Sequence, residues 1–155
     1  MVWYFGETSR FQPLLMWSDD YGETLAGHIL LNQIITSGDN VIYDLAFDAV
    51  DPKIIYAGMR GMVIKSPDNG NNWIVPLFIH PWAHSFRALC AHPEIPNRIF
   101  FAAWNDLYFS EDGGQTRIIL PTPFNIGILS MVFDDVKDRL YIGTSSGIYS
   151  YKDLP

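Results

Sequence analysis

The side chains best suited to bind a ligand gather in the pentapeptide His80-Pro81-Trp82-Ala83-His84. A second tryptophan stands beside two polar groups in Trp104-Asn105-Asp106. Aromatic rings next to hydrogen-bonding groups suit a sugar or another amphipathic ligand, because the rings cover its apolar face while the polar groups orient it. His80 and His84 could also ligate a metal, but no third ligand accompanies them in the sequence. A packed loop with an exposed tryptophan is the alternative without a ligand.

Charge and cysteine content argue against several classes of function. The chain of 155 residues has a formal net charge of −7 and no run of lysine or arginine, which disfavours nucleic acid and anionic membranes as partners. Its one cysteine, Cys90, excludes an intrachain disulfide and a zinc site with several cysteines. Cys90 lies in an apolar run, so we expect a core residue rather than a reactive thiol. The N-terminal residues lack a signal-peptide pattern, and no apolar run approaches the length of a membrane span.

A degenerate motif, Ser-x-Asp-x-Gly, recurs along the chain. Its fullest copy runs from Ser66 through Asp68 and Gly70 to Trp73. The same structural positions in the other two copies are Ser18, Asp20 and Gly22, and Ser110, Asp112 and Gly114. We expect the aspartate to accept hydrogen bonds from backbone amides of its turn, the glycine to adopt an angle that a Cβ resists, and Trp73 to pack against the hairpin. The motif therefore predicts a structural hairpin and no chemistry.

The spacing of the motifs predicts an all-β chain built of repeats. The aspartates at 20, 68 and 112 are 48 and 44 residues apart, a period typical of propeller blades with four strands each. Continuous apolar runs at 54–58 and 99–103 suit strands buried on both faces. Further strands are expected at 41–47, at 86–91 and from Trp73 onward. Residues 26–35, the best helical candidate, fit a fourth strand equally well. We expect a single domain of fourteen strands in four blades, two complete and two partial, at residues 1–35, 41–80, 85–121 and 127–153.

The motif and its flanking strands resemble the Asp-box, or BNR, repeat. The runs Ile55-Tyr56-Ala57-Gly58 and Gly61-Met62-Val63-Ile64-Lys65-Ser66 carry the resemblance best, and it extends over essentially the whole chain. Families with such repeats include sialidases, xyloglucan-cleaving glycoside hydrolases, sortilin-type receptors, fucose-type lectins and photosystem II assembly factors. The resemblance implies a β-propeller of four-stranded antiparallel blades with Asp-box hairpins. It leaves the function open, since these families do different things on one scaffold.

The resemblance also implies which loops face a ligand. In this family they are the loops from the second to the third strand of a blade and from the fourth strand to the next blade, while the Asp-box lies on the opposite face. The candidate ligand-binding residues are then Arg60, His80, Trp82, His84, Trp104, Asn105 and Asp106. A glycosidase requires two carboxylates across a cleft, and Asp106 would need Asp39 or Asp44 as its partner. We expect no catalytic residue, metal or cofactor.

These observations favour a non-catalytic binding or assembly scaffold that uses a propeller face to hold a protein or a carbohydrate. The alternative is a fragment or subunit of a secreted glycoside hydrolase. Four blades are few for a closed ring. Three arrangements therefore stay open: a piece of a longer protein, a half-ring completed by a second copy or a protein partner, and a small closed ring. The resemblance favours an extracytoplasmic location.

Overall fold

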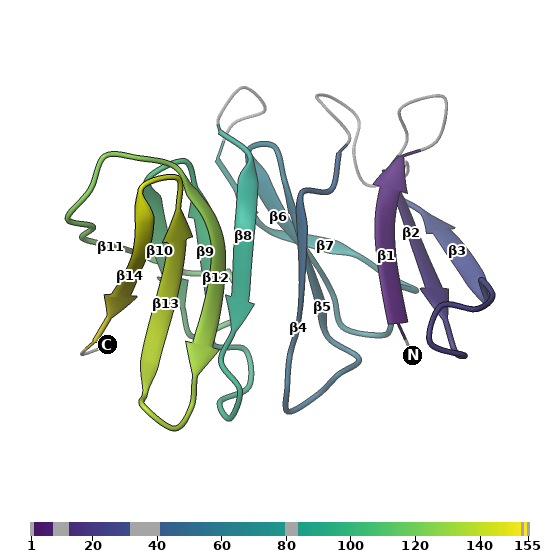
Figure 1. The fold of residues 1–155 in the computed structure, drawn as a ribbon. Helices are drawn as coiled ribbons and strands as arrows, with labels where there is room; N and C mark the ends of the chain where they lie inside the picture. The colour runs from purple at the N-terminus through teal and green to yellow at the C-terminus, as the bar shows by residue number, and fades with distance from the viewer. Residues whose placement is uncertain (1, 8–12, 32–40, 80–83, 153, 155) are drawn as a thin grey trace.

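The structure, a computed structural model, describes residues 2–7, 13–31, 41–79, 84–152 and 154. These residues form fourteen strands in four antiparallel sheets, and within each sheet the strands lie side by side in chain order (Figure 1). The first sheet contains β1 (Val2–Glu7), β2 (Pro13–Ser18) and β3 (Gly27–Leu30). The second contains β4 (Asp44–Phe47), β5 (Ile55–Met59), β6 (Met62–Ser66) and β7 (Ile74–Phe78).

The third and fourth sheets repeat this plan. The third contains β8 (Phe86–Ala91), β9 (Ile99–Ala103), β10 (Asp106–Ser110) and β11 (Ile118–Leu120). The fourth contains β12 (Ile128–Asp134), β13 (Arg139–Thr144) and β14 (Gly147–Tyr151). No helix occurs among the described residues, which agrees with the all-β prediction. The predicted count of fourteen strands is likewise found.

Strand bounds depart from the sequence prediction in a few places. The strand expected at 41–47 begins at Asp44, and the one expected from Trp73 begins at Ile74. The ambiguous segment 26–35 contains the strand β3, which pairs with β2. Pairing with a neighbouring strand, as well as residue type, determines where a strand begins and ends. The paired strands are therefore shorter than the segments that β-propensity alone predicts. The strand predicted at 86–91 has those bounds in the structure.

The second strand of each complete sheet is buried on both faces. Every residue of β5 and of β9 is buried. Successive side chains of a strand point to opposite faces of its sheet, so a continuous apolar run is satisfied only between two other sheets. The apolar runs at 54–58 and 99–103 therefore correctly predicted strands that lie buried between two other sheets.

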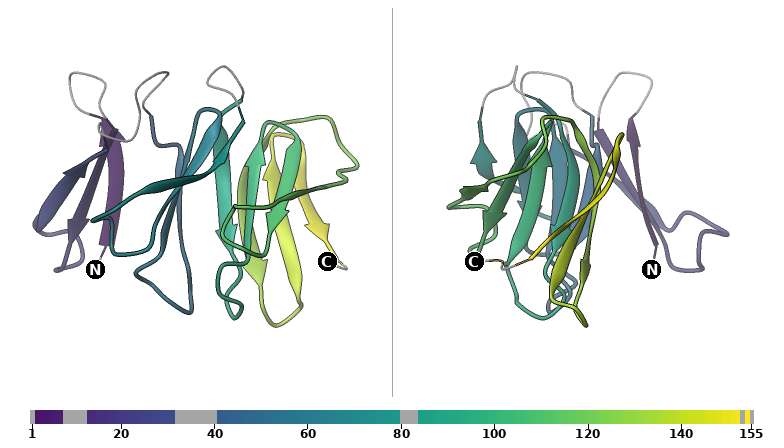
Figure 2. Two further views of the ribbon diagram at one scale, coloured as in Figure 1. Left: turned by 180° about the vertical axis from the view of Figure 1, so that it is seen from behind. Right: turned by 60° about the vertical axis from the view of Figure 1, so that its left-hand side comes forward.

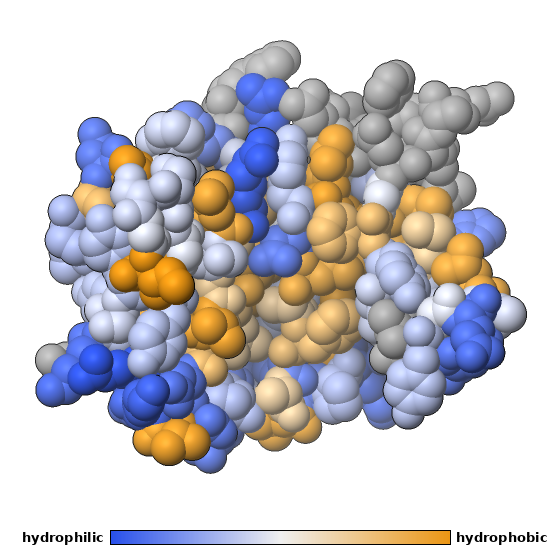
Figure 3. All heavy atoms as spheres, in the orientation of Figure 1, coloured by the Kyte–Doolittle hydropathy of each residue, from blue (hydrophilic) through white to orange (hydrophobic). Residues whose placement is uncertain are grey.

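The four sheets stack face to face in chain order, with the first and fourth at the two ends (Figure 2). Three apolar clusters lie in the three gaps between them. Their buried members include Leu15 and Ile64 in the first gap, Tyr56, Val63 and Phe101 in the second, and Phe100, Leu107 and Ile142 in the third. The strands that begin the second, third and fourth sheets lie beside one another, β4 next to β8 and β8 next to β12. Apolar side chains gather over this middle part of the molecule in Figure 3.

The three Ser-x-Asp-x-Gly loops share one set of hydrogen bonds. In the fullest copy the Gly70 amide donates to Ser66 Oγ at 2.7 Å, and Ser66 Oγ donates to Asp68 Oδ1 at 3.1 Å. The Asn72 amide donates to Asp68 Oδ1 at 2.7 Å. The same three bonds recur in the loops that begin at Ser18 and Ser110. The predicted role of the aspartate is thus confirmed for each loop.

The glycine and tryptophan of the fullest loop also behave as predicted. Gly70 has a φ of +82°, and Gly22 and Gly114 in the other loops have +98° and +97°. Such angles are easy for glycine and unfavourable for residues with a Cβ. The Trp73 indole N–H donates to the Gly70 carbonyl at 2.9 Å, and its ring packs against the cluster between the first two sheets. The loop is therefore held by hydrogen bonds among its own residues, from Ser66 at its start to Trp73 at its end.

Three hydrogen bonds join the second and third sheets in addition to their apolar contacts. Asp48 is buried, and its Oδ2 accepts the Asn97 amide at 2.7 Å. Lys65 Nζ donates to Asn97 Oδ1 at 2.8 Å. At the other end of β4, Asp44 Oδ2 accepts the Leu89 amide of β8 at 2.7 Å. These bonds fix the position of one sheet along the other, which apolar packing does not do by itself.

Candidate functional site

The predicted ligand face lies at the end of the sheets opposite the Ser-x-Asp-x-Gly loops. Because antiparallel strands alternate in direction, the turns β5–β6, β9–β10 and β13–β14 share one end, and the loops β2–β3, β6–β7 and β10–β11 share the other. Figure 1 shows this for the turn β13–β14 above and the loop β2–β3 below. Among the described residues, the structure thus places Arg60, His84, Trp104, Asn105 and Asp106 at the end of the sheets away from the structural loops.

Backbone contacts hold Arg60 beside the segment that enters the third sheet. Arg60 pairs with Ser85 in an antiparallel bridge. The Gly61 amide donates to the His84 carbonyl at 3.2 Å, and the Ile79 amide donates to the Gly61 carbonyl at 2.8 Å. The turn β5–β6 is therefore a support for both ends of the 79–85 connection. Gly61 has a φ of +69°, which the tight turn requires.

Trp104 and His84 form the aromatic part of the candidate site. Their ring centroids are 5.5 Å apart at an interplanar angle of 24°, a stacked arrangement. Trp104 is 52% exposed, so one side of a large ring faces solvent while His84 supports it. Its φ is +59°, an angle that is unfavourable for a bulky residue. The Ile128 amide holds this backbone through a 2.7 Å bond to the Trp104 carbonyl.

Polar groups lie next to this ring in the same turn. The Asn105 side-chain amide donates to Asn125 Oδ1 at 3.0 Å, and Thr122 Oγ1 donates to the Asn105 carbonyl at 3.3 Å. Asp106 is exposed, and its Oδ2 accepts the Tyr108 hydroxyl at 3.4 Å. The turn β9–β10 is thus fixed from the β11–β12 connection, which presents an ordered set of amide and carboxylate groups beside the indole.

The structure brings together part of the predicted set. Arg60 joins the His84 segment through backbone contacts, and His84 meets Trp104 through its ring. His80 and Trp82 lie outside the described residues. No group of three histidine, cysteine, aspartate or glutamate side chains suited to a metal ion occurs in the described part of the chain.

Asp44, considered as a second carboxylate, is engaged by the backbone. Its Oδ1 accepts a hydrogen bond from the backbone amide of the next residue, Leu45, at 2.9 Å, and its Oδ2 accepts one from the Leu89 amide. Burial raises the pKa of Asp44, and these two hydrogen bonds oppose the rise. Its role in the structure is to join β4 to β8. Cys90, predicted to be a core residue, is partly buried and packs against the cluster between the third and fourth sheets, and burial raises the pKa of its thiol to about 11.

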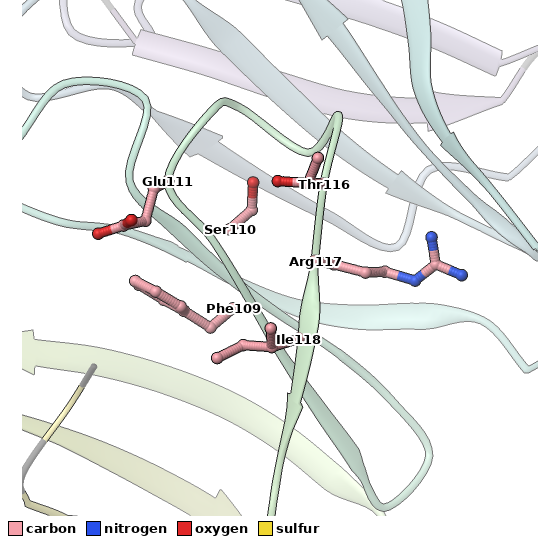
Figure 4. Close-up of a pocket in the computed structure, with 6 residues that line it drawn as sticks. All are labelled: Phe109, Ser110, Glu111, Thr116, Arg117 and Ile118. Atoms are coloured by element: carbon pink, nitrogen blue, oxygen red, sulfur yellow. The ribbon is translucent and has the colours of Figure 1, made fainter.

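Two cavities at the opposite end were not anticipated from the sequence. One, of about 210 Å³, is lined by Phe109, Ser110, Glu111, Thr116, Arg117 and Ile118. Figure 4 shows the Arg117 guanidinium and the Glu111 carboxylate pointing away from each other, and Glu111 forms an ion pair with Arg98 at 2.5 Å. The other, of about 480 Å³, is lined by Trp3, Phe47, Pro52, Lys53 and Asn69. Neither set is continuous in sequence, so no local motif could have indicated the larger one.

Comparison with known proteins supports the fold and no closer relationship. No family model matches the chain, and no curated protein matches it. Among solved structures, a GH74 enzyme from Niastella koreensis is similar to it, with a TM-score of 0.69 and 18% identity over 90% of this chain and 24% of that one. YCF48 bound to a D1 peptide gives a TM-score of 0.58 and 18% identity, covering 72% of this chain and 38% of that one. A chain of a nidogen–laminin complex gives 0.59 and 18%, covering 90% and 51%.

This chain has a β-propeller fold. In the described residues, the second and third sheets are complete four-stranded blades, and the first and fourth are three-stranded partial blades. The chain spans about a quarter to a half of the length of the similar structures named above. In the described parts of the chain, nothing forms a helix long and apolar enough to cross a membrane.

Proposed function

We propose that the chain is a non-catalytic binding or assembly scaffold, whose ligand face is the edge formed by Arg60, His84, Trp104, Asn105 and Asp106. The observation that carries this proposal is the geometry of Trp104. A half-exposed indole with a φ of +59° is costly, and it is stabilised by the stack on His84 and the bond from Ile128. Strained, exposed residues that their surroundings hold in place are typical of binding sites.

The chemistry of this edge suits a protein or carbohydrate ligand. An indole face binds the apolar face of a sugar or an apolar side chain of a peptide, and the neighbouring amide and carboxylate groups offer directional hydrogen bonds. Two of the similar structures were determined as complexes, one of YCF48 with a D1 peptide and one of nidogen with laminin. These support a protein partner as the first choice and a glycan as the second.

We further propose that the three Ser-x-Asp-x-Gly loops are Asp-box repeats and that the whole chain is one propeller domain. The shared hydrogen bonds of the three loops support the first point. The three apolar clusters that link the sheets without interruption support the second. The proposed blades remain those at residues 1–35, 41–80, 85–121 and 127–153.

Trp104→Ala tests the proposed ligand edge. Peptides selected from a displayed library on the wild-type protein, and xyloglucan oligosaccharides as a carbohydrate probe, are titrated against both proteins by calorimetry. Truncating a central aromatic anchor costs about 2 kcal/mol or more, so we expect about 30-fold weaker binding. Tyr21→Ala is the matched control, because Tyr21 is 90% exposed but lies in the loop β2–β3 at the opposite end. Equal affinity of the Trp104→Ala and wild-type proteins for every selected probe would refute this site.

The hydrolase alternative draws support from the GH74 enzyme among the similar structures. It requires a second carboxylate opposite Asp106. Of the two candidates, Asp44 already accepts two backbone amides, and Asp39 lies outside the described residues. Release of reducing sugar from xyloglucan is the decisive assay. Turnover by the wild type that is lost in Asp106→Asn would replace the scaffold proposal by the hydrolase one.

A further inference from the structure

The repeats place the same apolar position on β2, β6 and β10, the strands that lead into the Ser-x-Asp-x-Gly loops, and on the equivalent strand β14 of the fourth sheet. At this position Leu15, Val63, Leu107 and Ile148 pair with the preceding strand in the same relative register, opposite Phe5, Gly58, Ala102 and Gly143. In the first three sheets this side chain enters the cluster shared with the following sheet and is 0%, 1% and 0% exposed. Ile148 of the fourth sheet is 79% exposed.

Two neighbouring positions on the same face follow the same rule. On the second strand, Tyr56 and Phe100 are fully buried, whereas the equivalent Tyr141 is partly exposed. On the strand before it, Ala46 is 7% exposed and Cys90 is half-buried, whereas the equivalent Val132 is 61% exposed. We call the set Val132, Tyr141 and Ile148 the trailing face of the fourth sheet. It has the composition and register of a face that receives another sheet.

The first sheet carries the matching half of this contact. On the side that sheets two to four turn toward the preceding sheet, Ala57, Phe101 and Ile142 are at most 1% exposed. Their equivalent in the first sheet, Tyr4, is 39% exposed. Next to it lies Met16, which is partly exposed although Ile64 at the same position in the second sheet is buried. We call Tyr4 and Met16 the leading face of the first sheet.

We propose that a second copy of this chain packs its leading face against the trailing face of the fourth sheet, head to tail. This rests on the proposed scaffold function and names its assembly partner. The contact continues an interface that already occurs three times within the chain, and one chain carries both halves of it. Unlike faces form a heterologous contact, which closes into a ring or grows into a filament. Two copies bring together eight sheets, within the range of four to eight blades for propellers, whereas three copies would exceed it.

The mass in solution of wild type and of face variants tests the proposal. Sedimentation equilibrium of the wild type is expected to give twice the chain mass of 17.7 kDa. Ile148→Lys should weaken self-association at least tenfold, because it places a charge in an apolar contact. Val136→Lys is the control, since Val136 is 89% exposed in the turn β12–β13 of the same sheet, outside the trailing face. Circular dichroism and thermal unfolding establish that each variant is folded; if Ile148→Lys is not, Val132→Ser replaces it.

A second variant separates head-to-tail contact from contact between two like faces. Tyr4→Lys should also give monomers, and a mixture of Tyr4→Lys with Ile148→Lys should form dimers again, because each chain then supplies one intact face. A monomeric wild type overturns the proposal; the leading and trailing faces would then be free to pack against blades of a different protein. A Tyr4→Lys protein that dimerises like the wild type overturns it too. Loss of peptide binding in Trp104→Ala at unchanged mass concerns the ligand edge alone, so the two proposals fail separately.

Discussion

Replacing Ser66 by alanine should destabilise the protein by about 2 kcal/mol. Ser66 is fully buried, and its Oγ accepts the amide of Gly70, which is itself buried. The loss of this acceptor leaves a buried N–H without a partner, which costs about 1–3 kcal/mol. The cavity left by one hydroxyl oxygen is small, so the hydrogen bonds decide the magnitude. For a domain of this size each kcal/mol lowers the melting temperature by about 2–4 °C, so the expected fall is about 4–8 °C.

Urea and thermal unfolding of Ser66→Ala, of an equivalent variant and of a control variant measure this effect. Ser110→Ala removes the same bond to the Gly114 amide and should cost a similar amount. Ser146→Ala changes an exposed serine in the turn β13–β14 and should stay within about 0.5 kcal/mol of the wild type. If Ser66→Ala were as stable as Ser146→Ala, the serine would not be the acceptor that holds the loop, and the loops would owe their shape to glycine and aspartate alone.

Two further predictions concern a close approach and an acid-sensitive loop. Gly58→Ala should lower the free energy of unfolding in urea by about 3 kcal/mol, because a Cβ there would lie 2.3 Å from the Phe86 carbonyl oxygen, and a backbone atom cannot move aside as a side chain can. A loss below about 1 kcal/mol would contradict this packing. Hydrogen bonds from Asn72 hold the pKa of Asp68 below its usual value. The folded pKa is lower than the unfolded value of about 3.9, so the carboxylate stabilises the fold above that pH and its contribution is lost as the pH falls through the folded pKa. The urea midpoint should therefore fall on acidification below about pH 4, and less steeply in Asp68→Asn; equal slopes would contradict the assignment.

The sequence predicted those features that a short stretch of chain determines. The Ser66 loop encodes its own hydrogen bonds, since donor and acceptor lie within four residues of each other. The runs around Tyr56 and Phe100 encode burial on both faces, because alternation is absent from them. Repetition at a period in the forties then supplied the strand count and the end of the sheets at which each turn lies.

Contacts between distant residues could not be predicted in the same way. The stack of His84 on Trp104 depends on how two neighbouring sheets are aligned, and neither residue carries a signal of the other. The bond from the Asn97 amide to Asp48 joins residues 49 positions apart, and Asp48 looks like an ordinary turn residue in the sequence. The larger cavity likewise requires Trp3 and Phe47 from different sheets. A local sequence pattern predicts the strand to which a residue belongs, whereas a binding site depends on how several sheets stack on one another.

The links between the second and third sheets bear on how the protein comes apart. The buried Asp48 carboxylate ties them at one end of β4, and Asp44 ties them at the other. Unfolding by cooperative units begins where buried contacts are fewest, and within one chain each end sheet stacks on one neighbour instead of two. In a single chain we therefore expect the two middle blades to unfold last, and contact between the leading and trailing faces of two copies to protect the end sheets from opening first.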